Sequence, residues 1–373
     1  MSAEATAQLV RAPDHAELVE RARKIAKSAE GKAAQTSRDR HVSKETISDM
    51  FAAQLMDVVK PAAWGGMERR PSEFYELVYE LSRGCGSTGW TYAVLAGHSS
   101  ILPAFPQSAQ EAMWKETPDA LTSSAFAPTL RAEKVEGGYR VSGKSPFSSG
   151  SDHADWGLLG GMLVQDGAPP QPRLFLIPAS DFEIVDDWFV LGLEGTGSKT
   201  LNIDGAFVPD DRSIEMLEFF SGPAPFGLQA VMIGTARGAI EGYVEELKAK
   251  PGKFGGPAPS ETELYQSAIG AAMGDLTFAW ELLQKVVGEC EVILADGPDI
   301  PPEQALRNRS ATSLISRLCL GAMDRVFELS GGSGVYDGRL SRAYRDVRTG
   351  ANHAALNATM AARDAGAMIL KKS

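Results

Sequence analysis

The chain has 373 residues, of which 43% are hydrophobic and 23% charged, a composition typical of folded globular proteins. The formal net charge of −11 and the sequence pI near 5.1 argue against nucleic acid or an anionic membrane as a partner, because both require clustered lysine and arginine. The first residues lack the pattern of a signal peptide, and no apolar run approaches the ~20 residues of a membrane span. Three widely spaced cysteines predict reduced, buried thiols in a cytoplasmic protein.

Residues from about 13 to 114 carry the periodicity of helices. Asp14 is placed to cap a first helix, and apolar residues at helical spacing predict a second helix that Pro61 ends. The segment 86–101 is almost entirely small or apolar, which predicts one buried helix. Residues 108–111, Ser-Ala-Gln-Glu, fit the capping box of a short final helix.

The pattern changes between about 120 and 213. Short runs rich in β-branched and aromatic residues alternate there with Gly, Pro and Asp turns, which predicts a small antiparallel barrel or sandwich. The segment 143–156, Gly-Lys-Ser-Pro-Phe-Ser-Ser-Gly-Ser-Asp-His-Ala-Asp-Trp, is expected to form a loop between two strands. Its hydroxyl groups and backbone amides would be free to meet a ligand, and a polar surface turn is the alternative.

From residue 225 onward, four long helices joined by short loops are predicted, a pattern typical of a four-helix bundle. They are expected over 226–250, 260–294, 302–329 and 340–371. The expected fold class is therefore α+β and mainly α. Its three parts are an N-terminal helical domain over 1–118, a β domain over 119–215 and a C-terminal four-helix bundle over 216–373.

Two glycine-rich segments could give backbone amides to a phosphate or a flavin, and a tight turn is the alternative for each. Segment 192–199 lacks the Gly-Lys-Ser/Thr of a P-loop and leads into a strand. Segment 331–338 misses the Gly-x-Gly-x-x-Gly spacing and does not follow a strand. No Rossmann nicotinamide site is therefore predicted.

Five histidines are present, and two lie in surroundings that suggest a function. His98 falls in the apolar segment 86–101, where a charged imidazole is costly and a partner is expected. His353 lies among small residues on the predicted last helix. For each of them a structural hydrogen bond is the competing interpretation. No histidine or cysteine spacing predicts a metal site, and Ser149 lacks the Gly-x-Ser-x-Gly elbow of a hydrolase.

Five segments in order resemble the acyl-CoA dehydrogenase fold over nearly the whole chain. More narrowly, they resemble the oxygenase components of two-component flavin-dependent monooxygenases, a group that includes p-hydroxyphenylacetate hydroxylase and dibenzothiophene monooxygenase. The segments are Trp90–His98, Phe147–Trp156, Trp188–Ser198, Gly331–Tyr336, and Tyr344–Arg348 with His353 downstream.

The resemblance implies a homotetramer that binds flavin between the β domain and the bundles, with a neighbouring subunit completing each site. It implies catalytic roles for Ser149, at the reactive edge of the isoalloxazine, and for His98 and His353, which would flank the substrate. The flavin-binding residues expected are Phe147, Ser149, Trp188, Thr196, Gly197, Ser198, Gly331, Gly332 and Ser333. Tyr92 and Phe126 are added as substrate-lining candidates, although these two residues and Trp64 could equally belong to the core.

Dehydrogenases of this fold need a carboxylate base beside the substrate, and the common type supplies a Glu shortly after the Arg-Asp segment. Residues 348–353, Arg-Thr-Gly-Ala-Asn-His, contain no Glu. Because some dehydrogenases take the base from elsewhere, an acyl-CoA dehydrogenase-type flavoenzyme stays open as an alternative, as does a non-catalytic flavin-binding protein. His98 and His353 together favour oxygen chemistry.

The resulting hypothesis is a monooxygenase that receives reduced FAD or FMN from a separate NAD(P)H–flavin reductase. With O2 it would form a flavin hydroperoxide and hydroxylate a small phenol- or indole-like substrate, with His98 or His353 as the base. Nitrogen or sulfur oxygenation is the alternative to ring hydroxylation. No metal, nucleic acid or membrane partner is expected.

Overall fold

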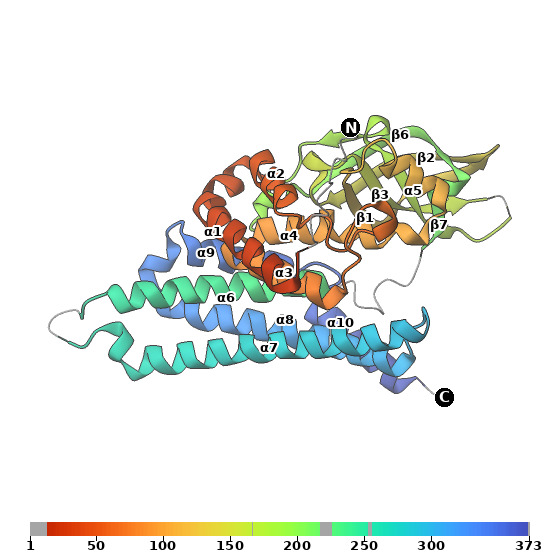
Figure 1. The fold of residues 1–373 in the computed structure, drawn as a ribbon. Helices are drawn as coiled ribbons and strands as arrows, with labels where there is room; N and C mark the ends of the chain where they lie inside the picture. The colour runs from red at the N-terminus through yellow and green to blue at the C-terminus, as the bar shows by residue number, and fades with distance from the viewer. Residues whose placement is uncertain (1–12, 166, 217–225, 253–255, 372–373) are drawn as a thin grey trace, which may run out of the picture.

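A computed structural model describes residues 13–165, 167–216, 226–252 and 256–371. The N-terminal helices and the sheet lie on one side of the long C-terminal helices (Figure 1). The first part of the chain forms α1 (His15–Asp39), α2 (Lys44–Ala52), α3 (Pro71–Gly84), α4 (Gly86–Leu95) and α5 (Gln107–Trp114). None of the described helices is long and apolar enough to cross a membrane.

Local sequence signals explain where several of these helices begin and end. Asp14 caps α1, and Glu17 returns a hydrogen bond to the Asp14 backbone N–H, as a capping box does. The segment 86–101 is not one helix, because α4 ends at Leu95 and two 3₁₀ turns follow around Pro103, which has no N–H to continue a helix. The capping box predicted at 108–111 does not form, since α5 starts directly after Pro106.

The β domain is one open sheet of seven strands, which differs from the expected barrel or sandwich. Its strands are β1 (Thr122–Val135), β2 (Gly138–Ser148), β3 (Trp156–Val164), β4 (Gln171–Pro178), β5 (Glu183–Val185), β6 (Lys199–Pro209) and β7 (Ser213–Glu215), in the order β5-β6-β2-β1-β3-β4-β7. All pairs are antiparallel except β1–β3. Because β2 continues to Ser148, the first part of the predicted loop 143–156 is strand.

The sheet separates two apolar layers, because side chains alternate along each strand. Leu158, Leu174 and Leu176 face α5 and pack with Trp114. Their neighbours in sequence face the other way, into a core where the sheet curls enough for Tyr139 of β2 to contact Phe175 of β4, with ring centroids 5.5 Å apart.

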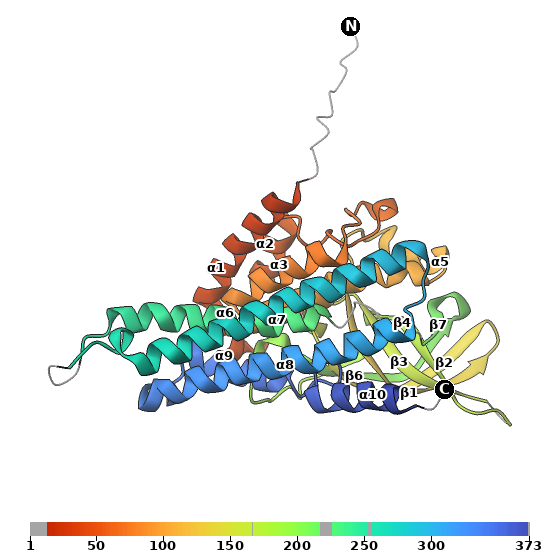
Figure 2. The same cartoon turned by 90° about the horizontal axis from the view of Figure 1, so that it is seen from below.

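The C-terminal bundle contains three long helices that run side by side: α6 (Phe226–Ala249), α7 (Glu263–Asp296) and α8 (Pro302–Ser330) (Figure 2). The fourth helix is interrupted, which corrects the single helix expected over 340–371. It consists of α9 (Arg339–Gly350) and α10 (Ala358–Leu370), because Gly350 favours a helix end and Asn357 caps a new helix by accepting the Met360 N–H. His353 therefore lies in a turn and not on a helix.

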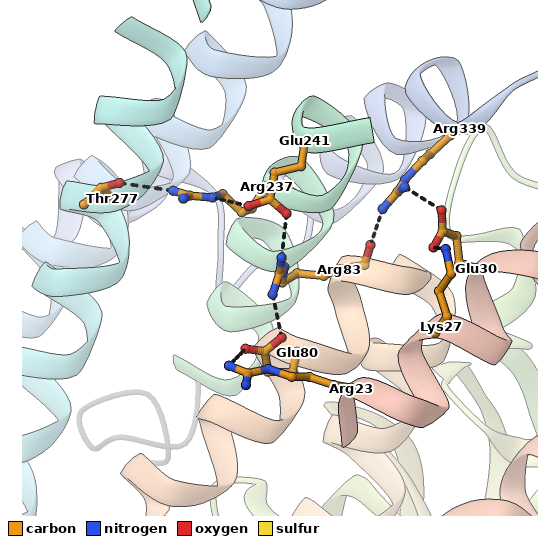
Figure 3. Close-up of polar contacts among 9 residues, drawn as sticks. All are labelled: Arg23, Lys27, Glu30, Glu80, Arg83, Arg237, Glu241, Thr277 and Arg339. Atoms are coloured by element: carbon orange, nitrogen blue, oxygen red, sulfur yellow. Dashed lines mark hydrogen bonds and ion pairs between the residues drawn. The ribbon is translucent and has the colours of Figure 1, made fainter. Parts of the chain in front are cut away.

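Charged side chains tie the N-terminal helices to the bundle (Figure 3). Glu80 of α3 accepts from Arg23 of α1 at 2.9 Å and from Arg83 at 2.8 Å. Arg83 also donates to Glu241 of α6 at 2.6 Å. On the other side of α3, Arg339 of α9 donates to Glu30 and to the Arg83 carbonyl. Helices from both ends of the sequence thus meet at α3.

Candidate active site

Ser149 lies directly after β2, where the backbone takes an unusual path. Phe147 has φ +65°, a conformation that is rare for a bulky residue and marks local strain. The turn leaves the Phe147 side chain exposed and buries Ser149. Gly150 follows at φ +74°, and a Cβ there would lie 2.9 Å from Leu95 of α4. The strand end is therefore pressed against α4, with one aromatic ring outside and one hydroxyl inside.

Ser149 is part of a buried network of hydroxyl groups. Its Oγ lies 2.7 Å from that of Ser198, and Ser198 Oγ lies 2.7 Å from Thr196 Oγ1. Thr196 donates to the Leu193 carbonyl at 2.8 Å, and the indole N–H of Trp90 donates to Ser149 at 3.1 Å. The structure thus brings together three of the predicted residues, Ser149, Ser198 and Thr196, in what is called below the hydroxyl network.

The loop that carries Thr196 and Ser198 is held by α9. Leu193 adopts φ +54°, and its N–H donates to the Asp346 carboxylate at 2.5 Å. A Cβ at Gly192 would lie 2.3 Å from the Arg345 backbone, so the loop packs directly on the helix. Asp346 is buried, and desolvation raises its pKa to about 6 although the Leu193 N–H opposes the shift.

His98 is buried between two polar groups of β1. Its Nδ1 lies 2.9 Å from the Thr122 carbonyl, which can only accept, so Nδ1 carries the proton. Its Nε2 lies 3.0 Å from the Ser124 hydroxyl and accepts from it. Desolvation lowers the pKa of His98 to about 4, against the effect of the Thr122 hydrogen bond. The imidazole is therefore neutral at pH 7, with a lone pair directed to Ser124.

His353 has the opposite arrangement of its two nitrogens. The Ala355 N–H donates to Nδ1 at 3.2 Å, so a neutral ring carries its proton on Nε2. The ring meets Trp90 edge-on, with centroids 5.6 Å apart. The residue is partly open to solvent. Protein atoms packed around the imidazole nevertheless desolvate its charged form and lower its pKa to about 4. His353 therefore offers an N–H where His98 offers a lone pair.

Several apolar side chains on the two segments that carry the hydroxyl network are open to solvent. Phe147 is 66% exposed and meets the half-buried Trp188 edge-on at 6.0 Å, and Phe189 and Leu191 are also exposed. A planar ring system that is apolar on its faces and polar at one edge fits such a surface, because aromatic side chains can pack on its faces while Ser149 meets its edge. The residues present therefore suit a flavin.

Comparisons with known proteins agree with this geometry. The N-terminal domain of the acyl-CoA dehydrogenases matches residues 12–116, and their C-terminal domain matches residues 226–358. The chain is 32% identical to the oxygenase subunit HsaA of a flavin-dependent monooxygenase from Rhodococcus jostii, over 87% of this chain and 90% of the relative. It is 31% identical to the oxygenase component of the FADH2-dependent resorcinol hydroxylase of a Rhizobium species, over 92% and 91%.

A solved structure, that of 3-HSA hydroxylase from a Rhodococcus species, superposes with a TM-score of 0.89 at 30% identity and covers 96% of this chain and 99% of that one. The chain belongs to the flavin-dependent monooxygenase oxygenase subunits. It has their acyl-CoA dehydrogenase fold and uses reduced flavin and O2. This membership confirms the resemblance seen in the sequence and decides against a dehydrogenase.

In this monooxygenase the aromatic residues considered as lining for the substrate site differ in their surroundings. Phe126 is half-buried and meets His98 edge-on, with centroids 5.7 Å apart. Tyr92 is fully buried, donates its hydroxyl to the Leu55 carbonyl and packs against Phe74. Tyr92 is therefore buried as a core residue is, which is one of the two interpretations that its sequence left open. Trp64 packs against Trp114, in the apolar layer between α5 and the sheet.

The predicted flavin residues Gly331, Gly332 and Ser333 lie elsewhere in the subunit. They form a 3₁₀ turn between α8 and α9, with exposed Val335 and Tyr336 beside it. Within the described residues, no hydrogen bond joins this turn to the hydroxyl network. Gly197, by contrast, lies beside the network at φ +53° and accepts from Ser151.

Some features of the monooxygenase subunit lie outside the predicted site. His153 donates its Nε2 proton to the Val42 carbonyl in the loop before α2, a structural role. In the part of the chain that the structure describes, no three His, Cys, Asp or Glu side chains gather as a metal site. A cavity of about 240 Å³ lies among α1, α3, α4, α6 and α9, and Asp346 borders it, but none of the predicted site residues does.

Sequence reasoning missed four residues that shape this site: Trp90, Ser124, Leu193 and Asp346. Trp90 and Asp346 stand in segments that carry the resemblance, but nothing in their spacing shows a hydrogen-bond role. Ser124 lies in a strand two residues from Thr122, and only the pairing of β1 against the 3₁₀ turn of His98 reveals its position.

Proposed function

We propose that this monooxygenase hydroxylates a small phenol, using reduced FAD or FMN that a separate NAD(P)H–flavin reductase delivers. The observation that carries the proposal is the neutral His98 with its lone pair held by Ser124. A base beside a phenolic hydroxyl raises the nucleophilicity of the ring, which is what an electrophilic oxygen requires. The relative named as a resorcinol hydroxylase supports a phenolic substrate.

The proton of the substrate hydroxyl would pass to His98 through Ser124. A phenol placed at Ser124 donates to Ser124 Oγ, and Ser124 passes its own proton to Nε2, 3.0 Å away. The pKa of His98 is low in the ligand-free subunit because its charged form is desolvated. A phenolate formed beside the ring would raise that pKa, since an opposite charge stabilises the imidazolium. Phe126 would form a wall of the same pocket.

His353 would act as a donor on the side of Trp90. With its proton on Nε2, it can hydrogen-bond to an oxygen atom between the flavin edge and the substrate. Ser149, Phe147, Trp188, Thr196, Gly197 and Ser198 would hold the flavin of the same subunit. Gly331, Gly332 and Ser333 would reach the flavin of a neighbouring subunit. When bound, reduced flavin supplies the electrons that activate O2; the surrounding residues orient it and exclude water.

The test mixes anaerobic protein and reduced FAD or FMN with air-saturated buffer that contains one phenol from a panel. Hydroxylated product and hydrogen peroxide are measured against the flavin oxidised, without any reductase present. We expect product in near-stoichiometric yield with at least one phenol. If every phenol gives only hydrogen peroxide and an indole or a thioether gives oxygenated product, the phenol hydroxylase proposal is wrong and another oxygenation takes its place.

We propose further that the subunit forms a homotetramer in the cytoplasm. Large apolar side chains are exposed on the outer helices and beside the Gly331 turn, as a surface buried by copies of the chain would be. They are Leu264, Phe278, Val292, Val335, Tyr336, Ile369 and Leu370. The three cysteines are free and buried, consistent with a reducing compartment. Sedimentation velocity at micromolar concentration should give the mass of four chains; a monomer mass would contradict the assembly.

A further inference from the structure

The cavity among α1, α3, α4, α6 and α9 lies apart from the residues of the proposed active site. Its volume is about 240 Å³. A cavity of roughly 150 Å³ can hold a benzene ring, so this one has room for a single ring with a short substituent. Much of its wall consists of small apolar residues, which are Gly31, Ala33, Ala34, Ala239 and Ala343.

Five of the described charged residues border the cavity, and four of them are already paired. Arg83 and Arg339 donate to carboxylates of the network that joins the helical parts (Figure 3). Glu30 accepts from Arg339 at 2.6 Å, and Asp346 accepts from the Leu193 N–H at 2.5 Å. These four residues therefore have hydrogen-bond partners within the subunit.

The fifth charged residue, Arg342 of α9, is different. Its side chain is only 12% exposed, yet no group in the described part of the chain accepts a hydrogen bond from its guanidinium. The carboxylate of Asp337 lies 3.8 Å away, too far for a hydrogen bond, and its side chain is 63% exposed. A guanidinium carries five N–H donors, and burying donors without acceptors costs free energy. Arg342 therefore lacks an acceptor that a bound ligand could supply.

The other unpaired group at the cavity can also donate. Thr235 of α6 borders the cavity, and its buried hydroxyl has no partner among the described residues. The cavity thus combines unpaired donors with an apolar wall. A ligand that fits it has acceptor oxygens at one end and an apolar body at the other.

We propose that the cavity binds a small organic carboxylate whose apolar part is about the size of one ring. The planar guanidinium of Arg342 matches a carboxylate with two parallel hydrogen bonds, and the alanine and glycine wall receives the ring. This site is separate from the flavin site and stands independently of the proposed hydroxylation. Asp346 borders the cavity and holds the Leu193 N–H, so the ligand would lie beside the residue that supports the loop of the hydroxyl network.

Calorimetric titration of the flavin-free, full-length subunit with benzoate tests the inference. Arg342→Met removes the guanidinium and keeps an apolar stem. Arg345→Met is the matched control, because Arg345 lies one turn further along α9, also pairs with Asp337, at 3.5 Å, and does not border the cavity. A second variant, Ala34→Leu, fills the cavity from α1 and leaves Arg342 in place, so it keeps the test informative where Arg342→Met unfolds.

We expect the wild type to bind one benzoate per chain with a dissociation constant below about 1 mM. Arg342→Met should weaken this binding by roughly tenfold or more, the worth of a hydrogen bond between charged groups. Ala34→Leu should weaken it to a similar extent, and Arg345→Met should leave it unchanged. Benzamide, which has the same ring and no charge, should bind at least tenfold more weakly than benzoate.

Several results would overturn the inference. Benzoate that binds Arg342→Met and Ala34→Leu as tightly as the wild type occupies another place, such as the proposed substrate site. Equal affinity for benzamide would show that the carboxylate is not recognised. Inorganic phosphate that binds as tightly as benzoate would indicate a site for inorganic anions, and a wild type without any benzoate binding would leave the cavity without this ligand.

Discussion

His98 shows how two neighbours fix the protonation of an imidazole. The Nδ1 proton donates to the Thr122 carbonyl, and the Ser124 hydroxyl donates to the lone pair on Nε2. His353 is set the opposite way by one backbone N–H. Two histidines that look equivalent in the sequence therefore present opposite groups: His98 has an acceptor nitrogen at Nε2, and His353 has an N–H donor at Nε2.

Replacing His98 with Asn should abolish most hydroxylation and spare flavin binding. The amide keeps a donor for Thr122 but cannot accept a proton from a phenol, so product formation should fall by about 10²–10⁴-fold. Oxygen consumption should continue with release of hydrogen peroxide. The measurement is the ratio of product to peroxide, with His15→Asn, a histidine paired with Glu76 on α3, as the control. An unchanged ratio in His98→Asn would remove the base assignment.

The resemblance to the family singled out Ser149, Thr196 and Ser198, and the apolar surroundings of His98 singled out that histidine. Neither observation predicted which atoms these residues use. The proton on His98 depends on a strand carbonyl, and Ser149 depends on a tryptophan of another helix. The role of Tyr92 stayed open for a similar reason, since an aromatic residue in a buried helix looks the same in sequence whether it lines a pocket or fills a core.

At the level of secondary-structure elements, α9 acts as a support for the loop that carries the hydroxyl network. Asp346 holds the Leu193 N–H, and Gly192 lets the loop backbone lie against the helix. The ends of the long helices α6, α7 and α8 were predicted to within three residues, because proline and glycine mark most of them. The sheet was less predictable, since the parallel pairing of β1 with β3 depends on contacts distant in sequence.

The buried Asp346 makes stability depend on pH. Its folded pKa of about 6 lies above the usual 3.8, so the folded protein binds the extra proton between these values. Its contribution to stability is therefore fully present below pH 3.8 and lost as pH rises through 6. The free energy of unfolding of Asp346→Asn, relative to that of the wild type, should therefore rise by about 3 kcal/mol from pH 4 to pH 7.

Urea unfolding of both proteins across this pH range is the measurement. Asn keeps an acceptor oxygen for the Leu193 N–H but cannot ionise, so the comparison isolates the charge of the carboxylate. A stability difference between the two proteins that stays constant from pH 4 to pH 7 would contradict the raised pKa.

On the scale of the whole molecule, the network around Glu80 determines how the two helical parts meet. The side chain of Glu80 is only 5% exposed and lies between Arg23 and Arg83, and Arg83 continues to Glu241 of the bundle (Figure 3). The three-part organisation follows from composition and helix periodicity. The network does not, because its members come from α1, α3 and α6, and exposed charged helix faces carry similar residues.

Glu80→Gln should destabilise the subunit by about 2 kcal/mol, because two arginines lose a buried, charged acceptor. Glu20→Gln provides the matched control: Glu20 also pairs with Arg23, but its side chain is 62% exposed, and its loss should change stability by no more than ~0.5 kcal/mol. Guanidinium unfolding of both variants gives the free energies. Equal effects of the two substitutions would show that burial of Glu80 is not what gives the network its strength.

The break between α9 and α10 has a consequence for the substrate range of the family. His353 lies in this turn, whereas the hydroxyl network lies just after β2 and in the loop before β6 that α9 supports. Among the described residues, the turn and the hydroxyl network are linked by the edge-on contact of His353 with Trp90, whose indole donates to Ser149. In the proposed site, a turn of different length or sequence would reshape the substrate side and leave the flavin side intact. New specificities would then arise by exchanging a short segment, without rebuilding the residues proposed to hold the flavin.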